Sequence, residues 1–93
     1  MFATLLSIVP ESRRFSHDEA LRVSKVALRQ RGARTVVIDL KHATDATTSA
    51  FARLVLLRRR LRANGRDLRL VNLHDRTESL YELNRLSRVL PRQ

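Results

Sequence analysis

The sequence predicts a small α/β fold in which strands and helices follow one another in the order β-α-β-α-β-α after a short N-terminal strand. Short β-branched and aliphatic runs alternate with longer segments of helical periodicity, and the segments that join them are short. The run Val36–Ile38 is apolar without interruption, as in a parallel strand that is covered on both faces. Such alternation favours right-handed parallel crossovers. We expect residues 1–93 to form one domain.

The first strand is expected at residues 2–9, an apolar run that Pro10 ends. Residues 11–15 form either a loop or a short second strand of a hairpin, and both remain open. Ser16 should begin the first helix, because Glu19 stands three residues later in the capping-box arrangement. Apolar residues then recur at helical spacing as far as Leu28, and Gly32 suits the end of this helix.

A second strand is expected at residues 34–40, followed by a loop at 41–47 and a helix over residues 48–63 that ends at Asn64-Gly65. The apolar positions of this helix share one face (Ala50, Leu54, Leu57, Leu61), and arginines occupy most of the remainder. A third strand at residues 68–73 should lead to a third helix, which begins at Asp75 with Glu78 in its first turn. The apolar positions expected to be buried in that helix are Leu80, Leu83 and Leu86, with Tyr81 as a further candidate.

The charge is strongly basic, at a formal +10 that comes from 17 arginines and two lysines. This charge favours anionic partners such as nucleic acid, acidic protein surfaces or phospholipid headgroups, although a solvated surface in an arginine-rich proteome would give the same composition. The absence of cysteine excludes disulfides and thiol chemistry. No apolar run approaches the roughly 20 residues of a membrane span, and the apolar start lacks a basic leader, so we expect a cytoplasmic protein without membrane insertion.

Catalytic and metal-binding patterns are not found in the sequence. His17, His42 and His74 are isolated and do not have the spacing of metal ligands. The chain holds only two glycines, so a glycine-rich phosphate loop is excluded. We therefore expect no enzymatic activity, no cofactor and no bound metal.

Hydroxyl side chains gather where the second expected helix begins, at Thr47, Thr48 and Ser49. One of them is expected to cap the helix, which is the commonest use of such residues. Alternatively, one accepts a phosphate, which would add about −1.5 to −2 charge beside the positive end of the helix. Asp39, at the end of the preceding strand, either caps nearby amides or lies beside this site, and the sequence leaves both readings open.

Ala52 and Leu56 lie one turn apart on the same helix and point away from its buried face. A single exposed leucine is common on protein surfaces. A small apolar area bordered by arginines is also typical of a docking surface. The junction around Asp45–Ala50 is consequently where we expect function to be found.

Five elements follow one another along the chain: VVIDL, the hydroxyl cluster, an apolar and basic helix ending in ANG, the strand LRLVNL, and the terminal SLYELNRLSRVLP. In this order they resemble the STAS domain, the family of bacterial anti-sigma-factor antagonists that also occurs on sulfate transporters and in a lipid-transport accessory protein. The resemblance covers residues 35–90. It implies a mixed sheet of about four strands, joined by an N-terminal hairpin, with helices packed alongside and no catalysis.

An alignment without gaps places Asp39 on the family's first aspartate and Thr47 on its second, and Ala50 replaces a glycine. Thr48 and Ser49 fall on the two hydroxyl positions. The resemblance implies that Ser49 is the phosphoacceptor of an anti-sigma kinase, with Thr48 as the second candidate.

This sequence also departs from the family pattern. Thr47 removes a carboxylate that flanks the phosphoacceptor, and Asp45 replaces it only if the loop is built differently. Ala50 in place of glycine changes how closely a partner approaches the helix. The family's first hairpin, with its Gly-Glu-Leu-Asp-like turn, is not recognisable before Ser16.

The leading hypothesis is a regulatory protein-interaction module that takes part in partner switching and transcription regulation, and in which phosphate on Ser49 disfavours docking. Its expected partner-binding residues are Asp45, Thr47, Ala50, Ala52, Arg53 and Leu56. A first alternative is an adaptor subunit that binds the ATPase of a membrane lipid-transport complex constitutively. A second alternative is nucleic-acid binding through the helix at Arg58–Arg62, with weak nonspecific binding expected at low salt.

Overall fold

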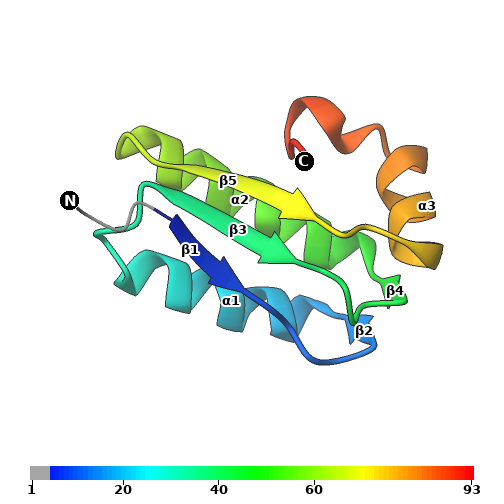
Figure 1. The fold of residues 1–93 in the computed structure, drawn as a ribbon. Helices are drawn as coiled ribbons and strands as arrows, with labels where there is room; N and C mark the ends of the chain where they lie inside the picture. Colours follow the sequence, from blue (N-terminus) through cyan, green and yellow to red (C-terminus); the bar gives the residue numbers. More distant parts are fainter. Residues whose placement is uncertain (1–4) are drawn as a thin grey trace.

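The computed structural model describes residues 5–93 (Figure 1). Its elements are β1 (Leu5–Ile8), β2 (Arg14–Phe15), α1 (His17–Arg29), β3 (Thr35–Asp39), β4 (Asp45–Ala46), α2 (Thr48–Ala63), β5 (Asp67–Val71), α3 (Asp75–Leu83) and the 3₁₀ helix η1 (Leu86–Arg88). The predicted order of the main strands and helices is confirmed. The start of the expected first strand, residues 2–4, lies outside the described residues.

The strands form two parallel sheets, so the mixed four-stranded sheet that we expected is not what the described residues show. One sheet has the order β1-β3-β5 and the other pairs β2 with β4. Residues 11–15 do not fold back on β1 as a hairpin. Instead, β2 leads into α1 and β4 leads into α2, so their pairing brings the N-termini of the two helices side by side (Figure 1).

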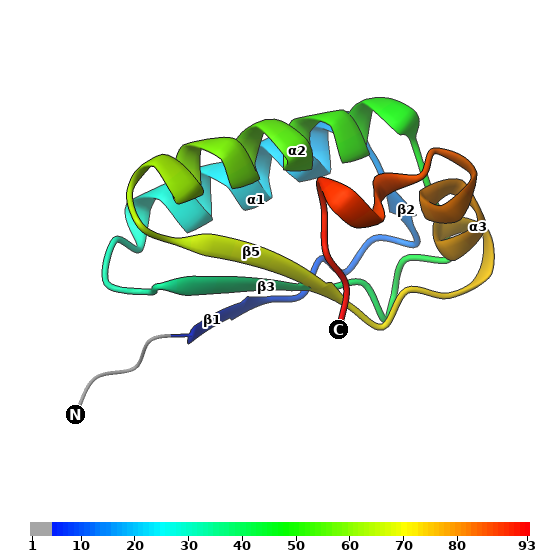
Figure 2. The same ribbon diagram turned by 90° about the horizontal axis from the view of Figure 1, so that it is seen from above.

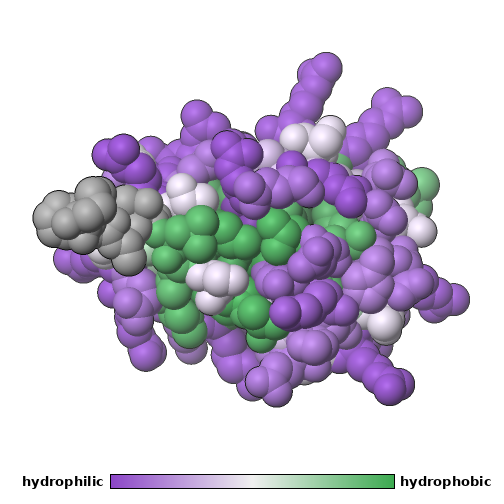
Figure 3. Space-filling model, viewed as in Figure 1, coloured by the Kyte–Doolittle hydropathy of each residue, from purple (hydrophilic) through white to green (hydrophobic). Residues whose placement is uncertain are grey.

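The helices α1 and α2 cover one face of the three-stranded sheet (Figure 2). The row Ile8–Ile38–Leu70 lies on the covered face, and Ile38 and Leu70 are fully buried. The adjacent row contains Arg69, which is exposed. No described helix lies on that second face, so the expectation that the strands are covered on both faces is wrong. Figure 3 views the molecule from the side of this open face and shows apolar surface there.

The core lies between the covered face and the two helices. Small residues of α1, Ala20 and Ala27, are fully buried and allow α2 to approach closely. The large side chains of Phe15, Phe51 and Leu54 fill the space between the layers. Because interiors pack at crystal-like density, this small core fixes the positions of both helices on the sheet.

The helix ends largely follow their predicted signals. Ser16 caps α1, and its Oγ accepts the N–H of Glu19 at 3.3 Å. The helix α2 has the predicted bounds, and Gly65 adopts a φ of 73° in the turn that follows it. At the other end of α1, the guanidinium of Arg66 donates to three carbonyl oxygens and so ties α1 to the start of β5.

The third helix differs from the prediction at both ends. His74 occupies the N-cap position, and no side chain caps the helix; Asp75, the expected cap, binds His74 instead. Leu83 is 80% exposed, so its predicted burial is wrong, whereas the further candidate Tyr81 is buried and Leu80 and Leu86 are partly buried against the core. The cause is an early end: Arg85 adopts a left-handed φ of 50° and redirects the chain into η1.

None of the described helices is long and apolar enough to cross a membrane.

Candidate functional site

The first turn of α2 is organised by Thr47. This residue is the N-cap, with extended backbone angles, and its Oγ1 accepts the N–H of Ala50 at 3.1 Å. The same oxygen lies 3.2 Å from Oγ of Ser49. The expectation that one hydroxyl serves as the cap is therefore met by Thr47, and the hydroxyl of Ser49 lies within hydrogen-bonding distance of it.

Thr48 and Ser49 are exposed, while Ala50 beneath them is fully buried. The first turn of α2 contains no acidic residue. Its N–H groups and the helix dipole create a positive potential that would favour an added anion at either hydroxyl. Both phosphoacceptor candidates are thus reachable from solvent and lie in an environment compatible with a phosphate.

Asp45 has a local role. It lies in β4 opposite Arg14, and its Oδ1 accepts the N–H of Ala46 at 2.9 Å. The carboxylate is therefore engaged in the strand that leads into α2. No contact among the described residues joins it to the hydroxyl of Ser49.

Asp39 binds groups at the carboxyl end of the sheet. Its Oδ1 accepts the N–H of Lys41 at 3.0 Å and the side-chain amide of Asn72 at 2.9 Å, and Nζ of Lys41 lies 3.6 Å from Oδ2. Burial raises the pKa of Asp39, but the hydrogen bonds from Asn72 and Lys41 and the charge of Lys41 outweigh it and hold this pKa below 3.8. These contacts favour the amide-capping reading of Asp39.

His74 joins the β5–α3 connection to the loop after β3. Its Nδ1 lies 2.7 Å from Oδ2 of Asp75, and its Nε2 lies 2.8 Å from the carbonyl oxygen of Lys41. Both partners are acceptors, so both ring nitrogens must carry protons to satisfy them. The hydrogen bond to Asp75, followed by that to Lys41, raises the pKa of His74 above 6.5.

The start of α3 braces the same loop further along. The buried Thr77 donates its hydroxyl to the carbonyl oxygen of Ala43 at 2.7 Å, and the N–H of Arg76 donates to Thr44 at 3.1 Å. Sequence patterns do not report such contacts, because they join residues more than thirty positions apart. Through these contacts, α3 fixes the loop at Ala43 and Thr44, which leads through β4 to the N-terminus of α2.

An apolar groove begins at this N-terminus and runs along α2. It has a volume of about 410 Å³, and its lining consists of Thr48, Phe51, Ala52, Val55, Leu56, Asn84 and Leu86. Ala52 and Leu56, expected at a docking surface, both line it, and Leu56 is 45% exposed. Sequence reasoning missed Val55, Asn84 and Leu86, the last two because they come from the turn after α3.

The arginines of α2 do not form a uniformly free basic face. Arg58 donates Nε to Oδ1 of Asp67 at 2.8 Å and a terminal nitrogen to the carbonyl oxygen of Val89 at 3.3 Å. Arg53 is half-buried, and its Nε is buried without a hydrogen-bond partner in the described structure. Arg58 is therefore engaged within the protein and is not available to contact a nucleic acid, whereas Arg59, Arg60 and Arg62 are exposed.

Within residues 5–93 there is no group of three or more histidine, cysteine, aspartate or glutamate side chains that could hold a metal ion.

Comparisons with known proteins support one family. The sequence model described as STAS domain matches residues 11–92. A comparison with curated proteins gives no match.

Proposed function

The chain belongs to the STAS domain family, and from this premise we propose that it is a regulatory module that binds a protein partner through the N-terminal half of α2. One observation carries the proposal. The exposed Thr48 lines an apolar groove, and the exposed Ser49 follows it in the first turn of the same helix. Apolar concavities next to polar anchoring groups are typical of binding surfaces.

The proposed docking face comprises Asp45, Thr47, Ala52, Arg53 and Leu56, together with the two hydroxyls. Ala50 is a packing position beneath this face, because it is fully buried. The exposed apolar atoms of Ala52 and Leu56 would supply most of the contact free energy, at roughly 25 cal/mol per Å² of surface removed from water. The hydroxyls would supply orientation.

Phosphorylation would then act as a switch, with Ser49 as the preferred acceptor and Thr48 as the second. A phosphate on Ser49 would add about −1.5 to −2 charge and considerable bulk at the edge of the groove. The helix N-terminus would stabilise the phosphate in the free protein. A partner that fits the unmodified hydroxyl would lose that fit, so modification disfavours docking.

A second candidate function is supported by Thr47. In this chain Thr47 stands where the family has an aspartate, and its side chain engages Ser49 and the Ala50 N–H rather than flanking a free hydroxyl. Constitutive docking on the same face, without a kinase, is compatible with this arrangement. The corresponding role is an adaptor that binds the ATPase of a lipid-transport complex.

Affinity capture from the native cell, with intact-mass analysis of the recovered protein, tests both candidates. The variants are Ser49→Asp, Ser49→Ala and the control Ser12→Asp, which places the same charge at an exposed serine outside the docking face. The switch predicts capture of a kinase-like anti-sigma partner that is lost only with Ser49→Asp. Equal capture by all variants of a transporter ATPase would remove the switch and favour the adaptor.

A further inference from the structure

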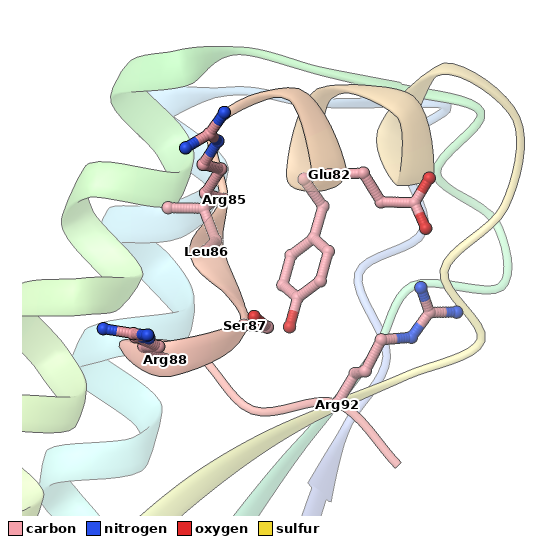
Figure 4. A pocket seen from close by; sticks show the side chains of 7 residues that line it. Glu82, Arg85, Leu86, Ser87, Arg88 and Arg92 are labelled. Atoms are coloured by element: carbon pink, nitrogen blue, oxygen red, sulfur yellow. The ribbon is translucent and has the colours of Figure 1, made fainter.

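A second hollow lies next to the apolar groove. It has a volume of about 750 Å³ and is lined by Tyr81, Glu82, Arg85, Leu86, Ser87, Arg88 and Arg92 (Figure 4). Leu86 lines both hollows. We call the combined depression the α2–η1 groove. It runs from the N-terminal half of α2 to the C-terminal segment.

The chemistry of this groove changes along its length. Its first part is apolar, with Phe51, Val55 and Leu56 on the α2 side and Leu86 opposite. Its second part is lined by three arginines and by one carboxylate, that of Glu82, so arginines dominate its charge. The ion pairs among the described residues include neither Arg85 nor Arg88, and both side chains are exposed.

The third arginine is already engaged. Arg92 forms an ion pair with Glu78 at 2.9 Å and lies 5.7 Å from the centre of the Tyr81 ring. Figure 4 shows Arg92 on the opposite side of the hollow from Arg85 and Arg88. The two unpaired arginines therefore provide the positive charge on the η1 side, where the apolar part of the groove ends.

We infer that the α2–η1 groove binds an amphipathic helix of a partner protein, with a row of apolar side chains in the apolar part and carboxylates facing Arg85 and Arg88. This inference rests on the proposed function, and it adds the chemistry of the partner. The apolar part of the groove is lined by α2, by the turn after α3 and by the start of η1, so it offers no free strand edge to an extended peptide. Recognition must then come from side chains, as when a helix lies in a groove with anchors at i, i+3, i+4 and i+7.

Charge complementarity selects an acidic partner. The chain carries a formal net charge of +10, so a second copy would bring like charges together at the same face. Carboxylates on the partner would instead steer the encounter and fix its register. A phosphate on Ser49, one residue from the groove-lining Thr48, would repel the same acidic helix, which accounts for the sign of the proposed switch.

The test uses fluorescent helix-forming peptides of about 18 residues and anisotropy at about 0.15 M salt, where exposed charges are partly screened. One peptide carries a leucine row flanked by glutamates. Its two controls replace the glutamates by lysines or the leucines by serines. We expect the glutamate peptide to bind the full chain at least about tenfold more tightly than either control, a difference of about 1.4 kcal/mol.

Variants then assign the binding to the groove. Leu56→Ser should weaken the glutamate peptide at least about fivefold, whereas Leu83→Ser, at a more exposed leucine outside the groove, should not change it. Arg88→Glu should weaken the glutamate peptide and strengthen the lysine peptide, while Lys25→Glu on α1 changes both only slightly. Circular dichroism verifies that each variant is folded.

Several results would overturn the inference: equal binding of the three peptides, retention of binding by Leu56→Ser, or identical behaviour of Arg88→Glu and Lys25→Glu. Binding of anionic vesicles that Leu56→Ser abolishes would assign the groove to a membrane, and a dimer that the same variant dissociates would assign it to a second copy. If Ser49→Asp abolishes capture of the partner but the glutamate peptide does not bind, only the inferred chemistry of the groove is wrong. If the glutamate peptide binds but Ser49→Asp leaves capture of the partner unchanged, only the proposed switch is wrong.

Discussion

Replacing Arg66 should destabilise this protein more than replacing any fully exposed arginine. Its Nε donates to the carbonyl oxygen of Ala33 at 2.6 Å, and its Nη2 donates to those of Ala27 and Gln30 at 3.0 and 2.8 Å. These carbonyls belong to the end of α1 and the turn after it, where intrahelical partners are missing. One planar guanidinium thus satisfies acceptors that a shorter or single-point donor cannot reach together.

The magnitude follows from these contacts. A hydrogen bond from a charged group contributes about 1.5–3 kcal/mol net, and the dipole at a helix C-terminus adds about 0.3–1 kcal/mol. In the variant Arg66→Ala, water can hydrogen-bond to the exposed carbonyl of Gln30 and so recovers part of this free energy. We therefore expect Arg66→Ala to lower the free energy of unfolding by about 2–4 kcal/mol. A protein of this size has about 5–14 kcal/mol in total. Arg66→Lys keeps the charge but loses the forked geometry, and should lose about half as much.

Urea unfolding followed by circular dichroism measures this difference, with Arg59→Ala as the control for loss of an exposed arginine. Thermal unfolding should agree, because each kcal/mol lowers Tm by about 4–8 °C in a domain of this size. A loss below about 0.5 kcal/mol for Arg66→Ala, or equal losses for Arg66→Ala and Arg59→Ala, would refute the reasoning. It would mean that water satisfies the three carbonyls as well as the guanidinium does.

Three further predictions concern buried and titrating groups. Tyr81→Phe removes the hydroxyl that donates to Leu90 at 2.6 Å and leaves a buried carbonyl unpaired, so urea unfolding should show a loss of about 1–3 kcal/mol. The hydrogen bonds of His74 raise its pKa above 6.5. Its contribution to stability is therefore full below pH 6.5 and is lost as pH rises through the folded-state pKa. NMR titration measures this pKa, and His74→Gln should flatten the dependence of the free energy of unfolding on pH over the same range. Burial raises the pKa of Asp67, but the hydrogen bond from Arg58 and further contacts outweigh burial and hold this pKa below 3.8. The contribution of Asp67 to stability is present above pH 3.8 and is lost as pH falls through the lowered pKa. Below about pH 4, the free energy of unfolding of Asp67→Asn should therefore depend less on pH than that of the wild type.

The parts of the fold that sequence reasoning predicted correctly have local signals. The helix α2 was predicted with its observed bounds, because the hydroxyl cap and the Asn64-Gly65 turn stand directly at its ends. The capping box of α1 is equally local, and it is formed as expected between Ser16 and Glu19. The position of Ala52 and Leu56 off the buried face of α2 is also local, because it follows from helical spacing alone, and both line the groove. Their role in binding a partner stays a prediction.

The parts that were missed depend on contacts between distant residues. A short strand within residues 11–15 was one of two open possibilities, but its parallel pairing with β4 joins residues far apart in the sequence, which a local pattern does not report. Leu83 was expected in the core and is exposed, because the left-handed Arg85 ends the helix without a glycine to mark the place. The η1 wall of the groove follows from the same turn, so the groove could not be predicted from the periodicity of α3.

The η1 wall is held in place by hydrogen bonds to the segment that follows it. Tyr81 anchors Leu90, Arg58 donates to Val89, and the N–H of Leu70 in β5 donates to Pro91. A helix that docks there meets a surface that is already shaped, so association carries little cost of ordering the receptor. Its rate is then governed by diffusion and by the field of the arginines, whereas the lifetime of the complex is governed by the leucines. In a cell, ionic strength would change how often such a partner arrives far more than how long it stays.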